Sequence, residues 1–229
     1  MKRILIMLAS GTGSRFGGDV PKQFLMLGGK MVIEHTMAAC DIGLFNEIIL
    51  VVSSPYVSKM KELVQRNGYK VAVRVVEGGA TRKESCCRGV EAIDERDAVV
   101  VVHNGVQPFV TGESFKRVID AVEGGCDAVT SAVPCVYTVL HVDENGDVDD
   151  IPDRASLRSD MGVEGFRLVL LRKLFTEYDD EVSTDIIGMV FRSRFGKVRI
   201  VDGDPRNIKI TRKEDMVLAE EFIREMSHG

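Results

Sequence analysis

The sequence predicts an α/β fold built on a doubly wound, mostly parallel sheet. Short runs of β-branched apolar residues alternate with amphipathic segments along residues 1–134. Two of these runs, IILVV at 48–52 and VVVV at 99–102, are apolar at every position, as expected for parallel strands covered by helices on both faces. Strands and helices that alternate at this spacing form βαβ units, which wind into such a sheet.

The same patterns place the individual elements. Strands are expected at Ile4–Leu8, Glu47–Ser53, Val71–Glu77, Val99–His103 and Ala128–Val133, and helices at Met31–Cys40, Tyr56–Arg66, Arg82–Ile93 and Gly112–Val122. Because ligands of such sheets bind beyond the carboxyl ends of the strands, the loops that follow the strands are the first places to search for a site.

The alternation changes after Pro134. Residues 135–166 read as short alternating segments around Asn145-Gly146, a dipeptide typical of a hairpin turn. We expect this hairpin to project from the sheet as a β-arm over about residues 135–160, too poorly buried to be stable alone. Beyond it we expect two helices, at 170–178 and from about 184, then strands at 198–201 and 208–210, and a closing helix at 212–226 with one apolar stripe.

Composition and charge restrict the classes of function. The 229 residues suit one domain spanning 1–229, and 45% hydrophobic with 28% charged residues is typical of a soluble globular chain. The net charge of -5 argues against a nucleic-acid partner, since such proteins usually carry a basic surplus. Within residues 1–30, however, Asp19 is the only acid, against the basic residues Lys2, Arg3, Arg15, Lys22 and Lys30. This basic island indicates a local site for an anion.

Cysteines and hydropathy indicate the compartment. The five cysteines are odd in number and contain no CxxC pair, and the four histidines are scattered, so neither a disulfide framework nor a zinc site is predicted. No apolar run approaches the roughly 18–20 residues that span a bilayer. The sequence therefore predicts a cytoplasmic protein with reduced cysteines and no membrane partner.

The strongest local feature is a glycine-rich loop directly after the first expected strand, in the stretch ASGTGSRFGGDVPKQF at 9–24. Glycines there let the backbone turn sharply and bring several N–H groups onto one anion. A dinucleotide fingerprint would need glycine where Phe16 stands, and a Walker A loop would need Lys-Ser/Thr where Asp19-Val20 stand. What remains is a triphosphate cradle completed by Arg15 and Lys22, or a structural turn with surface cations.

The run G-x-G-x-R followed by P-K-Q resembles the signature of a known family, the cytidylyltransferases that act on methylerythritol phosphate and ribitol 5-phosphate. Further similar blocks follow in the family's order: GGATR at 78–82 with Ser85, VHNGVQPF at 102–109, IPDR at 151–154, Thr184-Asp185, and NIKIT at 207–211. These blocks cover essentially the whole chain.

The resemblance implies a Rossmann-like nucleotidyltransferase whose β-arm pairs two subunits into a homodimer. It implies CTP and a small phosphorylated acceptor as partners and Mg²⁺ as cofactor. The residues it implies are catalytic Arg15, Lys22 and Lys209; CTP-binding Ala9, Ser10, Gly11, Thr12, Gly13, Ser14, Gly78, Gly79, Thr81 and Ser85; acceptor-binding Gln107, Arg154, Thr184 and Asp185; and Asn104 at the metal. Arg154 is expected to reach the site of the other subunit.

Three departures from the family pattern qualify this assignment. Asn104 replaces the aspartate that ligates magnesium, Gln107 replaces a nearby arginine, and GVEGF at 162–166 replaces a T-P-Q segment. An asparagine still offers a neutral oxygen to a hard cation, but it attracts the ion less than a carboxylate does. The departures are expected in a member tuned to another acceptor or in one with reduced activity.

The resulting hypothesis is a cytidylyltransferase that transfers CMP from CTP to a phosphorylated polyol, of the ribitol 5-phosphate or methylerythritol phosphate class. IPDR at 151–154 and QPFVT at 107–111 are slightly nearer to the polyol-phosphate enzymes. The alternatives are the methylerythritol 4-phosphate enzyme specifically, a non-catalytic nucleotide-binding homologue, and a nicotinamide-dependent reductase.

Several of these residues also have structural interpretations. Asp185 suits a helix cap and Asn104 suits a turn after its strand. His103 is expected to pack at a strand end. Lys209 suits the surface of an edge strand, and Arg154 suits a salt bridge within the arm.

Overall fold

A seven-stranded sheet organises the chain, of which the computed structural model describes residues 1–11, 20–179 and 185–228. The strand order is β11-β7-β10-β6-β1-β4-β5, and only β10 runs antiparallel to its neighbours. The strands are β1 (Lys2–Ala9), β4 (Glu47–Val52), β5 (Ala72–Glu77), β6 (Ala98–Asn104), β7 (Ala128–Pro134), β10 (Arg158–Arg167) and β11 (Val198–Asp202). The expected mostly parallel sheet is confirmed.

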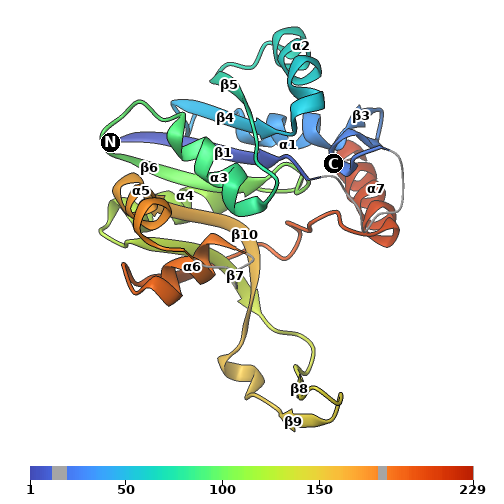
Figure 1. Cartoon of the computed structure of the whole chain (residues 1–229). Helices are drawn as coiled ribbons and strands as arrows, with labels where there is room; N and C mark the ends of the chain where they lie inside the picture. Colours follow the sequence, from blue (N-terminus) through green and yellow to red (C-terminus); the bar gives the residue numbers. More distant parts are fainter. Residues whose placement is uncertain (12–19, 180–184, 229) are drawn as a thin grey trace.

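Helices cover both faces of this sheet (Figure 1). The first face carries α1 (Val32–Cys40), α2 (Val57–Asn67) and α4 (Gly112–Glu123), and the second carries α3 (Arg82–Glu91), α5 (Leu168–Glu177) and α6 (Ile186–Ser193). All seven residues of β6 are buried, as its apolar run requires. The sheet is therefore doubly wound, and β1, flanked by β4 and β6, marks the point where the strand order reverses.

A small hairpin supports the last helix. Strands β2 (Met26–Leu27) and β3 (Lys30–Met31) pair beside α7 (Lys213–His228) (Figure 1). Gly28 has a φ of +54°, and a Cβ on it would lie 2.6 Å from Cγ2 of Ile223 in α7. Only glycine fits this position, since both the backbone conformation and the close approach exclude a side chain.

Strand β10 corrects the expectation for residues 135–166. The sequence reads there as short alternating segments, yet Arg158–Arg167 forms a long strand inserted between β6 and β7. Its pairing with β7 shifts register between Asp160 and Glu164, where Gly162 has a φ of +71°. At Gly165 a Cβ would lie 2.3 Å from Cγ1 of Val118, so glycine lets α4 pack directly on this strand.

Between β7 and β10 the chain leaves the sheet and forms the arm seen below it in Figure 1. The arm contains the short strands β8 (His141–Val142) and β9 (Val148–Asp150) and the 3-10 turn η4 (Arg154–Ser156). It carries a series of exposed apolar side chains: Val136, Tyr137, Val139, Leu140, Val142, Val148 and Ile151. This apolar surface is unusual for a projecting segment of a lone chain.

One other element differs from expectation. Residues 208–210 form no strand; Ile210 N donates to Val106 O at 2.9 Å, but no ladder of such bonds follows. The helix expected from about Thr184 is confirmed as α6, which begins at Ile186; Thr184 itself lies outside the described residues. No helix in the described ranges is long and apolar enough to cross a membrane.

Candidate active site

A cavity of about 310 Å³ opens at the carboxyl ends of β1 and β6. This is the reversal point of the strand order, where doubly wound sheets bind their ligands. Most of its lining was expected from the sequence to contact substrates: Ala9, Ser10, Gly11, Lys22, Gly79, Thr81, Asn104 and Lys209. The remaining lining residues are Leu8, Gln23, Ala80, Arg82 and Val106.

Gln23 fixes the beginning of the glycine-rich loop. Its side chain is 2% exposed, and Nε2 donates to the carbonyl oxygens of Ala9 at 2.8 Å and Gly11 at 3.2 Å. A buried side chain therefore anchors the backbone at the point where the loop leaves β1. The sequence contained Gln23 only as the last residue of the P-K-Q motif, with no role assigned. The expected triphosphate ligands Thr12, Gly13, Ser14 and Arg15 lie outside the described residues.

The loop after β5 packs against the first loop through small residues. Ser85 Oγ lies 2.8 Å from Ser10 Oγ and accepts a hydrogen bond from Gly79 N at 3.1 Å. A Cβ on Gly78 would lie 2.8 Å from Cβ of Ser10, so the close contact of the two loops depends on that glycine. Gly78 and Ser85 thus lie beside the cavity, directly behind residues that line it.

A polar network lies beneath the other wall. Asn104 Nδ2 donates to Gln107 Oε1 at 2.6 Å, and Gln107 Nε2 donates to the carbonyl oxygens of Met161 and Asn207, each at 3.0 Å. The amide nitrogen of Asn104 is thereby engaged, which leaves its oxygen as the group able to accept from, or ligate, a bound species. Gln107 is only 3% exposed and lies behind Asn104 rather than in the cavity lining.

His103 packs at the strand end as expected. It is fully buried, its ring lies edge-on to Phe115, and its two nitrogens lie 2.8 and 3.2 Å from the carbonyl oxygens of Gly162 and Gln107. Burial lowers the pKa of this imidazole, against the effect of the two carbonyl contacts. His103 holds β10 and the Asn104 turn together and does not reach the cavity.

Arg82 and Glu164 form an ion pair that the sequence did not indicate. Arg82 is the first residue of α3 and lines the cavity, and its Nη2 lies 3.1 Å from Oε1 of Glu164 in β10. Burial raises the pKa of Glu164 to about 7, even though Arg82 acts in the opposite direction. Glu164 is thus the deeply buried partner, and a carboxyl so buried normally has a partner, whereas the Arg82 side chain remains 25% exposed at the cavity.

The structure does not bring the expected acceptor residues to the cavity: Gln107, Arg154 and Asp185 are not among its lining residues, and Thr184 lies outside the described part of the chain. Asp185 caps α6, with Oδ1 accepting from Gly188 N at 2.6 Å, so its interpretation as a helix cap is confirmed. Arg154 is exposed in the arm, where its Nη1 donates to Val136 O at 3.1 Å, and it is not among the residues that line the cavity of its own chain.

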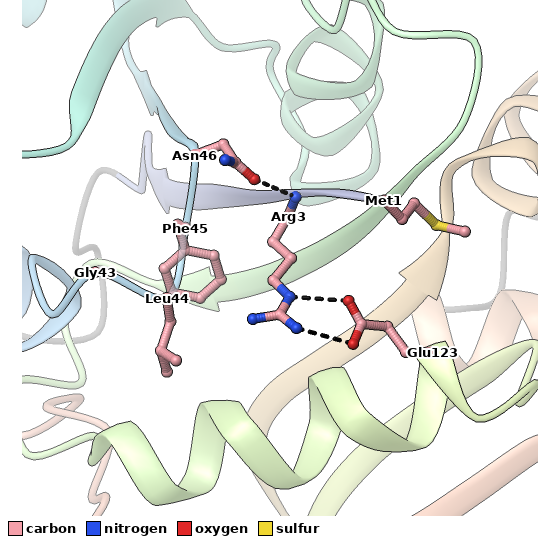
Figure 2. Close-up of a pocket in the computed structure, with 7 residues that line it drawn as sticks. All are labelled: Met1, Arg3, Gly43, Leu44, Phe45, Asn46 and Glu123. Carbon is pink, nitrogen blue, oxygen red and sulfur yellow. Dashed lines mark hydrogen bonds and ion pairs between the residues drawn. The ribbon is translucent and has the colours of Figure 1, made fainter.

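A second, larger cavity of about 640 Å³ lies at the opposite end of β1 (Figure 2). Arg3 forms a two-pronged ion pair there with Glu123, at 2.8 and 2.9 Å, and its backbone N–H donates to Asn46. Arg3 and Glu123, the charged side chains that line this cavity, are thus paired with each other. Its place at the amino-terminal end of the strands also argues against a substrate site.

The described residues contain no group of three or more His, Cys, Asp or Glu side chains able to hold a metal ion. The amide oxygen of Asn104 is a hard donor in the cavity wall. Since Mg²⁺ is usually bound by few protein ligands together with substrate phosphates and water, one such oxygen fits an ion that enters with a nucleotide.

Comparison with known proteins decides the family. The sequence profile of the 2-C-methyl-D-erythritol 4-phosphate cytidylyltransferases matches residues 3–225. The enzyme of that name from Thermobifida fusca is 34% identical over 230 residues, covering 95% of this chain and 92% of the relative, and that from Geobacter metallireducens is 36% identical over 226 residues, with 95% of each covered. The chain belongs to this family. It is a nucleotidyltransferase, a CTP-dependent cytidylyltransferase, as expected.

Solved structures of the cytidylyltransferase family agree. The 4-diphosphocytidyl-2C-methyl-D-erythritol synthase of Anaerococcus prevotii superposes with a TM-score of 0.85 at 29% identity, over 97% of this chain and 98% of that one. The Thermus thermophilus 2-C-methyl-D-erythritol 4-phosphate cytidylyltransferase gives 0.74 at 25% identity, over 98% and 100%. The family and fold expected from the sequence are thus confirmed.

Proposed function

We propose that the protein transfers a cytidylyl group from CTP to 2-C-methyl-D-erythritol 4-phosphate. The match to this family along residues 3–225 carries the proposal, and the convergence of Lys22, Lys209 and the glycine loops on one cavity supports it. The relatives favour this acceptor over ribitol 5-phosphate, although the segments at 107–111 and 151–154 are slightly more similar to the polyol-phosphate enzymes.

The chemistry joins two anions. An oxygen of the acceptor phosphate attacks the α-phosphorus of CTP, the bond from that phosphorus to the β-phosphate oxygen breaks, and its electron pair leaves with pyrophosphate. The attacking phosphate is already an anion near neutral pH, so the reaction needs no side chain to remove a proton. Catalysis consists of positioning and of charge stabilisation in the transition state.

The roles of the residues follow from this requirement. We assign Arg15 and Lys22 to the triphosphate and the departing pyrophosphate. Lys209 bridges the acceptor phosphate and the α-phosphate, which would otherwise repel each other at contact distance. We assign the backbone N–H groups of residues 11–14 to the triphosphate, and the Gly78-Gly79 loop, held from behind by Ser85, to the cytosine. Thr184 and Asp185 are assigned to the acceptor.

An assay of pyrophosphate release tests the function. The protein is supplied with CTP and, in separate reactions, 2-C-methyl-D-erythritol 4-phosphate, ribitol 5-phosphate or neither. We expect release with the first acceptor to exceed release with the second at least tenfold in kcat/KM. Preference for ribitol 5-phosphate would contradict the assigned acceptor. Tight CTP binding without turnover on any acceptor would instead favour the non-catalytic homologue.

We propose Mg²⁺ as the cofactor, held by Asn104 Oδ1 together with phosphate oxygens of CTP. When bound, such an ion supplies positive charge that reduces repulsion between the phosphates. Replacing Asn104 with aspartate places a carboxylate at this position. We expect Asn104→Asp to lower the Mg²⁺ concentration for half-maximal activity about tenfold, since a full negative charge attracts the ion more than an amide oxygen does.

Calorimetric titration of CTP at several Mg²⁺ concentrations provides a readout apart from turnover. Asn104→Ala, which removes the oxygen, is the matched variant and is expected to shift the Mg²⁺ requirement the opposite way. Identical Mg²⁺ requirements in all three proteins would remove Asn104 from the metal site.

We also propose that the arm pairs two subunits. Its exposed apolar side chains, such as Tyr137 at 84% exposed, would be covered by a second subunit. Arg154 does not line the cavity of its own chain and instead donates to Val136 O within the arm. A two-fold dimer would bury the arms and bring Arg154 of each subunit to the site of the other.

Complementation between subunits tests this arrangement. Arg154→Ala and Lys22→Ala are each expected to be nearly inactive alone. After the two are mixed and allowed to exchange subunits, we expect about a quarter of wild-type activity, because half of the dimers are mixed and each mixed dimer has one intact site. Each variant exchanged with itself is the control. No recovery in a verified mixed dimer would place Arg154 outside the partner's site.

A further inference from the structure

The ion pair of Arg82 and Glu164 joins two regions of the fold at the cavity. Arg82 begins α3, directly after the loop that follows β5, whereas Glu164 lies in the middle of β10. In the sheet, β6, β1 and β4 separate β10 from β5. The contact therefore links the start of α3 to the strand that pairs with β6, at whose end Asn104 lies.

This pair is only half satisfied. Glu164 is 1% exposed and contacts Arg82 through Oε1 at 3.1 Å, while its Oε2 is buried and has no hydrogen-bond partner in the described part of the chain. The same holds for Nη1 of Arg82. Buried charged groups normally satisfy their hydrogen bonds, so Glu164 and Arg82 do not fully satisfy each other. The Arg82 side chain is 25% exposed and lines the cavity, so the part of the guanidinium that is not closed off by protein is available to an anion there.

Two other carboxylates, those of Asp185 and Asp160, raise the pKa of Arg82 without contacting it. Burial opposes its charge, but Glu164, Asp185 and Asp160 raise the pKa of the guanidinium overall. Asp185 Oδ1 is engaged by Gly188 N, and Asp160 Oδ1 accepts from Thr130 Oγ1 at 2.5 Å. Glu164 is thus the carboxylate that fixes the side chain, while the others keep the surroundings favourable to a cation.

We propose that Arg82 binds a phosphate group of the bound substrates, and that Glu164 is the residue that positions it. A guanidinium presents five N–H donors in a rigid fork that matches phosphate oxygens. A single-pronged contact with Glu164 holds one nitrogen and leaves other donors for a ligand. Arg82 lines the cavity together with Lys22 and Lys209, so a phosphate held by these lysines lies within the region that Arg82 also lines.

This inference rests on the proposed function, and the phosphate could be that of CTP or that of the acceptor. Arg82→Lys keeps the charge but loses the fork, and Arg88→Lys, an exposed arginine on the same helix, is the matched control. Calorimetry with CTP alone and the KM for the acceptor at saturating CTP separate the two sources. We expect Arg82→Lys to lose about 10- to 100-fold in one of these quantities.

A double-mutant cycle tests the positioning role. Glu164→Gln in the wild-type background is expected to weaken the same quantity about tenfold. In the Arg82→Lys background it should have little further effect, because Glu164 acts through the guanidinium. Equal effects of Glu164→Gln in both backgrounds would overturn the positioning role.

The outcomes are distinct from those of the assay for function. If wild type releases pyrophosphate while Arg82→Lys binds CTP and uses the acceptor within twofold of wild type, this inference is wrong and the function stands. A lower melting temperature with unchanged binding and kinetics would make the pair merely structural, and would overturn it equally. If wild type turns over no acceptor, the proposed function fails. Calorimetry with CTP and with 2-C-methyl-D-erythritol 4-phosphate then tests the inference independently, and unchanged binding of both by Arg82→Lys overturns it.

Discussion

Replacing Lys22 with alanine is expected to lower kcat about 10²- to 10³-fold while leaving the fold intact. Charge builds on the departing pyrophosphate in the transition state, and removing one preorganised partner of such charge typically costs this much. Lys22 lines the cavity, and its neighbours hold its backbone without it: Gln23 bonds into the end of β1, and the Phe24 ring lies 4.6 Å from that of Tyr56. The loss should therefore be chemical.

Pyrophosphate release under saturating substrates, with CTP affinity measured separately, checks this expectation. Lys30→Ala is the matched control, since Lys30 belongs to the same basic island but is exposed in β3 and does not line the cavity. A drop in kcat much larger than the change in CTP affinity would show that the lysine acts chiefly in the transition state. Unchanged turnover in Lys22→Ala would exclude the triphosphate assignment.

The fold was predictable where burial is uniform. β1, β4 and β6 lie in the sheet interior, so their sequences are apolar on both faces and read as strands without ambiguity. β10 is equally central, but Gly162, Glu164 and Gly165 interrupt its apolar character. Each has a tertiary cause: a register shift, an ion pair and the packing of α4. No local pattern contains these causes.

The site divides in the same way. Residues at the ends of β1, β5 and β6 could be assigned because the topology of a parallel sheet brings strand ends together, and the cavity contains most of them. Arg82 and Glu164 are 82 positions apart, and neither has a neighbour in sequence that indicates the other. Gln107 shows the opposite case. Its motif is recognisable in the sequence, but its buried position behind Asn104 is fixed by hydrogen bonds to the distant residues Met161 and Asn207, which the motif does not reveal.

The stability of the protein is expected to depend on pH through Glu164. Burial raises its pKa to about 7 in the folded protein from an ordinary value of 4.5. Below about pH 4.5 the carboxyl is protonated in both the folded and the unfolded chain. Between these values the unfolded chain releases the proton that the folded protein retains, so the free energy of unfolding falls as pH rises, and above about 7 the loss is complete.

Glu164→Gln is neutral at every pH and lacks this contribution. The difference in free energy of unfolding, variant minus wild type, should therefore rise by about 3 kcal/mol between pH 4 and pH 8, the equivalent of the shift in pKa. The groups facing Glu164 are Arg82, Asp160 and Asp185, and they are present in both proteins, so their own effects largely cancel.

Urea unfolding of both proteins across this pH range measures the difference. Glu220→Gln removes one exposed acid from α7 and controls for the change in net charge. A flat difference would mean that Glu164 has the same pKa in the folded and unfolded protein, so that Arg82 fully offsets the effect of its burial. The stability curve thus measures, without substrate, how strongly Arg82 and Glu164 interact in the pair from which the phosphate-binding role of Arg82 is inferred.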